Sequence, residues 1–143
     1  MGDLPVNETD RTPAEAGWKI EKLAEIEDVA AKRDPSGARQ ARFPAGSLGL
    51  SQIGMSHQVL GAGIRQPFGH RHSLLEELVY AVAGSGRARL DDEVVEVQAG
   101  DLLRIGPEVM RAFEGGEDGL ELAIFSQKIE ADEPEIVRDW WQG

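Results

Sequence analysis

Residues 49–127 consist of short apolar runs separated by glycine-rich turns, and this pattern constrains the fold more than any other feature of the chain. Strands are predicted at 50–60, 64–72, 77–83, 86–90, 93–98, 101–105, 109–113 and 120–127. Asp91 and Asp92 lie between two of these runs, which is typical of a β-hairpin. Many short strands with no helix between them indicate a β-sandwich or β-barrel, so this region is predicted to be all-β.

Two polar segments flank this region. In the first, Trp18, Ile20, Leu23, Ile26 and Val29 recur at spacings that favour a short amphipathic helix over about 20–32. Residues 38–43 alternate like an edge strand that could add to a partner's sheet. We therefore predict an N-terminal arm with a short helix and an edge strand (1–48), a β-barrel (49–127) and an acidic C-terminal tail (128–143).

Composition excludes several classes of protein. The 143 residues include no cysteine, which rules out disulfides, zinc–thiolate sites, iron–sulfur clusters and thiol catalysis. The net charge of −11 repels phosphate backbones and anionic lipids, so neither a nucleic-acid nor a membrane partner is expected. No signal-peptide pattern begins the chain, and no apolar run approaches the ~20 residues of a membrane span. The expectation is a soluble cytoplasmic protein.

Two of the three histidines, His70 and His72, stand two residues apart, and Glu77 follows. Residues i and i+2 of a strand point to the same face, so both imidazoles can reach one centre. Two neutral imidazoles and a carboxylate form a set that binds divalent iron, manganese, nickel or zinc and leaves positions open for substrate. Such a pair can also occur without a metal, and spacing alone leaves both alternatives open.

The stretch from Gly63 to Gly84 resembles the first motif of the cupin superfamily, with a glycine, His-x-His, a glutamate and a second glycine. Counting back from Gly84 selects Glu77 rather than Glu76 as the glutamate. The stretch from Gly100 to Arg111 resembles the second cupin motif. The resemblance implies a small cupin-like jelly-roll β-barrel with an internal pocket, often with a transition metal and often as a homodimer.

The second cupin motif usually ends in a histidine that completes a three-histidine, one-glutamate metal site, but here Arg111 takes that position. Arginine does not lose its proton in proteins and cannot ligate a metal. Its charge repels a cation, unless an anionic substrate bridges the two. Without metal, Arg111 could instead pair with Glu77 and close the site. Both arrangements remain open from the sequence.

Three further residues are candidates for substrate binding, each with a structural alternative. His57 shares a strand face with apolar residues, where it could serve as a pocket acid/base or be a hydrogen-bonded core histidine. Arg65 precedes the histidine pair and could contact a polar ligand or lie at a solvated strand end. Tyr80 could hydrogen-bond a ligand or be a buried aromatic residue. No catalytic residue is assigned.

The predicted function is a small-molecule-binding protein with a divalent metal at His70, His72 and Glu77, in which Arg111 holds an anionic substrate group. It could be an oxygenase or an isomerase. The alternative is a metal-free binding or sensing module without catalysis. A homodimer is expected, because sheet edges must be covered and three tryptophans lie outside the barrel. Packing of these tryptophans within one chain is the alternative.

Overall fold

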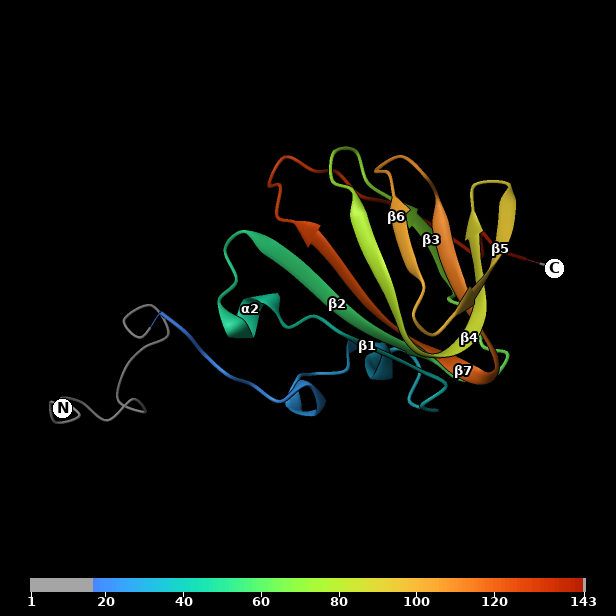
Figure 1. The fold of residues 1–143 in the computed structure, drawn as a ribbon, viewed down its shortest axis with the longest axis horizontal. Coiled ribbons are helices and arrows are strands. Elements are labelled where there is room, and N and C mark those ends of the chain that lie inside the picture. The colour runs from blue at the N-terminus through green and yellow to red at the C-terminus, as the bar shows by residue number, and fades with distance from the viewer. Residues whose placement is uncertain (1–16, 143) are drawn as a thin grey trace, which may run out of the picture.

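The computed structural model describes residues 17–142 and confirms the all-β prediction for them (Figure 1). The strands are β1 Arg39–Arg42, β2 Ile53–Leu60, β3 Phe68–Arg71, β4 Glu77–Leu90, β5 Glu93–Gln98, β6 Leu102–Ile105, β7 Arg111–Gln127 and β8 Glu135–Arg138. The short helix α2, Ala45–Leu48, connects β1 to β2. No helix among the described residues is long and apolar enough to cross a membrane.

The strands form one curled sheet in which β4 and β7 pair along most of their length. Residues 77–84 of β4 pair with residues 120–126 of β7, whereas residues 86–90 pair with residues 111–115. The first half of this ladder also carries β2 and β6, and the second half carries β3 and β5. The sheet thus folds over itself in two halves, in the manner of a jelly roll.

The sequence predicted turns at 84–86 and 114–119, but the structure continues β4 and β7 as strands through both segments. Register shifts near Gly84 and Gly86 bend the sheet at this point. Gly84 has a φ of 80°, and a Cβ atom there would lie 2.1 Å from the carbonyl oxygen of Gly119. Glycine is required because the two bent strands approach each other through their backbones. The predicted hairpin at Asp91 and Asp92 is confirmed by the pairing of β4 with β5.

The hydrophobic core fills the inside of the curl and is built from alternate residues of the long strands. Its fully buried members are Leu60, Val79, Ala81, Ala88, Val97, Ile105, Phe113, Leu120, Leu122 and Ile124. In β4, Val79 and Ala81 face this core, while Leu78, Tyr80 and Val82 are exposed on the opposite side. We call the core side the inner face and the opposite side the outer face.

The helix expected over 20–32 does not form. Two 3-10 turns occupy the segment instead, η2 Leu23–Glu25 and η3 Val29–Lys32. Asp28 explains the break, because its Oδ1 accepts the backbone N–H groups of both Ala30 and Ala41 and so ties the arm to β1. The edge strand at 38–43 is also used differently: β1 pairs with β2 of its own chain rather than with a partner's sheet.

The acidic tail contains a strand that the sequence did not predict. β8 pairs with β3 and so extends the sheet next to the histidine pair. Beyond β8, the guanidinium of Arg89 lies 4.0 Å from the ring centroid of Trp140, and that of Arg65 lies 4.3 Å from the ring of Trp141. Trp141 is buried. Trp140 and Trp141 thus anchor the tail on their own chain. This is the packing within one chain that the sequence analysis gave as the alternative to an interface.

Candidate metal centre

His70, His72 and Glu77 come together as the sequence predicted. Each can offer one ligand atom such that the three atoms lie within 4.8 Å of one another, and in residues 17–142 no other histidine–carboxylate group meets this criterion. The Nε2 atoms of His70 and His72 lie 3.7 and 3.6 Å from the Glu77 carboxylate. The group is half-buried, so it combines partial shielding from water with access from outside. It could hold a metal ion.

The two halves of the folded sheet supply the three residues. His70 lies in β3, opposite Arg111 of β7, and His72 follows the end of that strand. Glu77 is the first residue of β4 and pairs with residues of β6 and β7 in the other half. The bend in the sheet therefore brings the histidines and the carboxylate face to face.

Asp132 of the tail holds His72 in one orientation. Its Oδ2 lies 2.8 Å from His72 Nδ1, while its Oδ1 accepts the backbone N–H groups of Ser73, Leu74 and Leu75. Burial alone would raise the pKa of Asp132, but these hydrogen bonds and the His72 charge lower it to about 2. An ionised carboxylate can only accept, so Nδ1 of His72 carries a proton, and in the neutral ring Nε2 keeps its lone pair.

His72 Nε2 is buried and has no hydrogen-bond partner among the described residues. A buried nitrogen with a free lone pair is costly unless it binds something. A carboxylate on the far nitrogen is also the usual support of a metal-binding histidine. The donor set and this unpartnered atom therefore fit a metal ion.

Arg111 lies on the inner face beside the same group. Its side chain is fully buried, its Nη2 donates to the carbonyl of Gly106 at 2.8 Å, and its Nη1 lies 3.8 Å from Glu77 Oε1. Nε and Nη1 have no hydrogen-bond partner in the described chain. Burial lowers the pKa of Arg111, and the charges of Glu77, Asp91 and Asp132 oppose that effect. The guanidinium is a buried cation with unused donors.

Glu77 is surrounded by groups that favour its ionised form. Burial raises its pKa, but the interaction with His70 and the charges of His70, Arg111 and His72 outweigh burial and lower it overall. The carboxylate is consequently ionised at neutral pH, which is the form that binds metals.

The other sequence candidates lie away from this group. His57 and Tyr80 face outward: His57 contacts the Glu121 carboxylate at 2.8 Å, and Tyr80 is half exposed on the outer face. Tyr80 follows Glu77 by three residues, and an odd separation on a strand places two side chains on opposite faces. Arg65 contacts Glu114 at 2.7 Å and stacks on Trp141. The structure does not bring these three residues to the metal group.

Two polar residues of β2 that sequence reasoning missed line the inner face, beside Gln66, which precedes the histidine pair and was a possible contact to a polar ligand. Ser56 and Gln58 of β2 alternate with His57 and share the side of the core residue Leu60. Gln66 reaches across to Gln58 and also accepts the backbone N–H of Phe113. Leu60 is the buried end of β2, and counting back from it in steps of two would have placed Gln58 and Ser56 on the inner face. Asp132 gave no such signal, since it is one acid of many in the tail.

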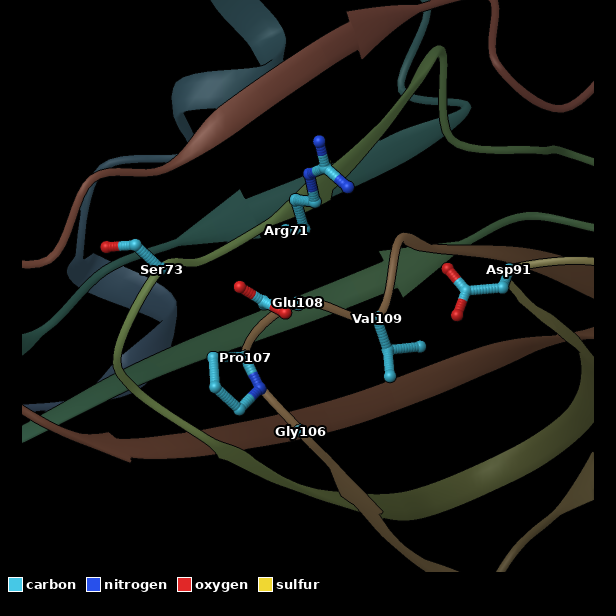
Figure 2. A pocket seen from close by; sticks show the side chains of 7 residues that line it. All are labelled: Arg71, Ser73, Asp91, Gly106, Pro107, Glu108 and Val109. Atoms are coloured by element: carbon cyan, nitrogen blue, oxygen red, sulfur yellow. The ribbon is translucent and has the colours of Figure 1, made fainter.

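A hollow of about 550 Å³ is lined by residues other than His70, His72 and Glu77 (Figure 2). Its lining residues are Arg71, Ser73, Asp91, Gly106, Pro107, Glu108 and Val109. The loop at 106–109 lines this hollow, and the carbonyls of its Gly106 and Pro107 accept from the side chain of Arg111 and from the backbone N–H of His72. This loop thus holds two site residues with its backbone.

No family profile and no curated protein matches the chain in sequence. Solved structures do match. A cupin protein from Bacteroides fragilis is 25% identical, with a TM-score of 0.64 over 88% of this chain and 97% of that one. A sugar phosphate isomerase of the cupin superfamily from Silicibacter pomeroyi is 18% identical, with a TM-score of 0.66 over 85% and 82%.

A putative sugar phosphate isomerase from Acidithiobacillus ferrooxidans is 19% identical, with a TM-score of 0.60 over 68% of this chain, which spans 64% of that protein. A polyketide cyclase and a salicylate 1,2-dioxygenase share the fold as well. The reactions differ among these neighbours, so the likeness establishes the fold and not one activity. The chain has the cupin fold, and its histidine motif together with these neighbours supports its assignment to the cupin superfamily.

Proposed function

We propose that the protein binds a small anionic molecule at a divalent metal ion held by His70, His72 and Glu77. Arg111 contacts the anionic group of that molecule in this proposal, because its guanidinium lies beside Glu77 with unused donors. The observation that carries the proposal is His72 Nε2, a buried nitrogen without a partner that faces Glu77 while Asp132 occupies the other ring nitrogen.

The metal, when bound, supplies a Lewis acid or an oxygen-activating centre, which suits an oxygenase or isomerase type of reaction. The residues of the chain bind and orient. Asp132 fixes the His72 ring, Arg111 neutralises the substrate's negative charge, and Ser56 and Gln58 offer neutral hydrogen-bonding groups on the same inner face. The partial burial of the group limits its access to water.

Elemental analysis of protein purified without a polyhistidine tag tests the metal. We expect near-stoichiometric iron, manganese, nickel or zinc, and loss of it in a His72→Ala variant. His57→Ala is the matched control, because it removes a histidine on the outer face and should leave the metal content unchanged. Failure to retain or take up any of these metals at micromolar concentration near pH 7.5 contradicts the proposal.

The proximity of Arg111 to Glu77 favours a second candidate, a metal-free binding module. A buried guanidinium 3.8 Å from a carboxylate already neutralises it and opposes a further cation. This candidate predicts that the metal-free protein binds small carboxylates and that an Arg111→Met variant does not. Isothermal titration calorimetry with citrate before and after treatment with a chelator separates the two functions, because the leading proposal requires the metal for binding.

A further inference from the structure

A second arginine on the inner face is not used by the proposed function. Arg39 is the first residue of β1, and it pairs with the core residue Leu60 of β2. Residues directly opposite each other in an antiparallel pair share a face of the sheet. The Arg39 side chain therefore lies on the inner face, where it is half-buried.

Arg39 has no anionic partner among residues 17–142. The carboxylates whose charges act on it, Asp28 and Asp34, accept backbone N–H groups and form no ion pair with it. Burial lowers the pKa of Arg39, and the charges of these two acids offset this only in part. A half-buried cation with five N–H donors is costly unless an anion reaches it. The other arginine side chains of the described residues that form no hydrogen bond or ion pair are exposed: Arg33, Arg104 and Arg138.

Phe68 of β3 brings Arg39 next to the proposed metal group. The guanidinium of Arg39 lies 5.9 Å from the centroid of the Phe68 ring, and this ring lies 6.5 Å from the ring of His70. Phe68 and His70 are two residues apart in one strand, so both side chains lie on the inner face. Arg39 and His70 thus neighbour the same ring, Arg39 from one half of the folded sheet and His70 from the other.

The inner face carries positive charge at two places beside His70. Arg111 lies opposite His70 in the pairing of β3 with β7. Around Phe68 lie Arg39 and Arg138, since Arg138 of β8 is paired with Phe68 and shares its face. The chain as a whole has a net charge of −11, so these cations form a local positive region on an acidic protein. Such a region attracts anions.

We propose that the molecule bound at the metal group carries two anionic groups, of which Arg111 contacts one and Arg39 contacts the other. This inference rests on the proposed function and names its substrate class: a small dianion whose second group is a carboxylate or a phosphate. The planar guanidinium offers two parallel N–H donors to either group. Gln58 stands opposite Ala41, two residues from Arg39 along the same face, and offers a neutral amide to the part of the molecule between the charges.

Isothermal titration calorimetry of the full chain tests the charge of the ligand, with Mn²⁺ added and again after treatment with a chelator. Glutarate is compared with its monomethyl ester, and 3-phosphoglycerate with glycerate. We expect the more highly charged member of at least one pair to bind at least about tenfold tighter, because only that member reaches Arg39 with an anionic group. The first pair reports a second carboxylate, and the second pair reports a phosphate.

Substitution of Arg39 then assigns the preference to this residue. Arg39→Gln should reduce the preference to less than about twofold and leave the affinity of the less charged member within about twofold of wild type. Arg104→Gln is the matched control, because it removes the same charge from an exposed arginine that pairs with Leu78 on the outer face. This control should keep the preference.

The inference is refuted if neither glutarate nor 3-phosphoglycerate binds, if neither pair shows the preference, if Arg39→Gln retains it, or if Arg104→Gln loses it equally. Its failure is distinct from failure of the proposed function. A metal-loaded protein that binds both members of each pair equally supports the metal site and refutes the second anionic group. A protein that takes up no metal but keeps a preference that depends on Arg39 contradicts the metal site and supports this inference. If Arg39→Gln does not fold by circular dichroism, Arg39→Met replaces it, and an unchanged preference there refutes the inference.

Discussion

Replacing Asp132 by asparagine should weaken metal binding without touching a proposed ligand. The carboxylate now accepts from His72 Nδ1 through one oxygen and from three backbone N–H groups through the other. Asparagine has one oxygen and one NH₂ group. If its oxygen stays with the three N–H groups, its NH₂ faces Nδ1, which must then accept. The ring proton moves to Nε2 of His72, and the lone pair that faces Glu77 is lost.

The opposite orientation of the amide is higher in free energy, because it places the two N–H donors of the asparagine against three backbone N–H donors. Leaving a buried donor unsatisfied costs about 1–3 kcal/mol, so the first orientation is expected. Loss of an outer support of a metal-binding histidine typically lowers metal affinity about 10- to 100-fold, or about 1.4–2.7 kcal/mol. We expect a loss in that range for Asp132→Asn.

Competition with a chromophoric chelator at pH 7.5 measures the dissociation constant for Zn²⁺ or Mn²⁺. Nitrogen-15 NMR of the metal-free protein reports the His72 tautomer directly. Asp92→Asn is the control, since it makes the same change in the exposed turn between β4 and β5. Affinity within twofold of wild type, with Nδ1 still protonated, would refute the reasoning.

Three further outcomes are expected. Arg111→His should raise metal affinity at least about tenfold, because it adds a ligand and removes a positive charge 3.8 Å from Glu77. Competition with a chelator measures the affinity, and no gain in a folded variant contradicts this expectation. The folded-state pKa of Asp132, about 2 against an ordinary 3.8, means that its ionised form adds stability fully above about pH 4, and this stability is lost as pH falls toward 2. Urea unfolding at pH 5 and pH 3 should therefore show a smaller drop in Asp132→Asn than in wild type, and equal drops would count against the assignment. Trp141→Ala should lower the free energy of unfolding by about 3 kcal/mol, because a buried indole is lost. Trp18→Ala is the control at an exposed position and should change that free energy by less than about 0.5 kcal/mol. Similar losses for the two variants in urea titrations would disprove the anchoring of the tail.

Local pattern was sufficient for much of the fold and for the histidine pair, whereas Glu77 was selected over Glu76 by the resemblance to the first cupin motif. Short apolar runs predicted an all-β chain, and the Asp91-Asp92 hairpin formed as expected because a turn depends mainly on its own residues. The spacing of His70 and His72 fixed their common face in the same way, because side-chain direction in a strand follows a period of two. The same period places Tyr80, three residues after Glu77, on the face opposite to Glu77, and the structure has Tyr80 on that outer face.

Other features depend on residues far apart in the chain, and only the tertiary structure decided them. Asp132 lies 60 residues from His72, and no local pattern links them. The helical spacing at 20–32 was overridden by a tertiary contact, because the Asp28 carboxylate accepts the backbone N–H of Ala41 and so joins the arm to β1. A local pattern does not reveal a partner that lies outside its own segment.

The burial of Arg111 and the outward direction of the apolar side of β2 were likewise decided by packing. Each depends on which half of the folded sheet lies opposite, and the bend at Gly84 and Gly86 sets that arrangement. A strand pattern specifies two faces but not which of them is covered, because the cover comes from elsewhere in the chain. The sequence therefore determined most of the strands and the types of the candidate ligands, and the tertiary structure determined what surrounds them.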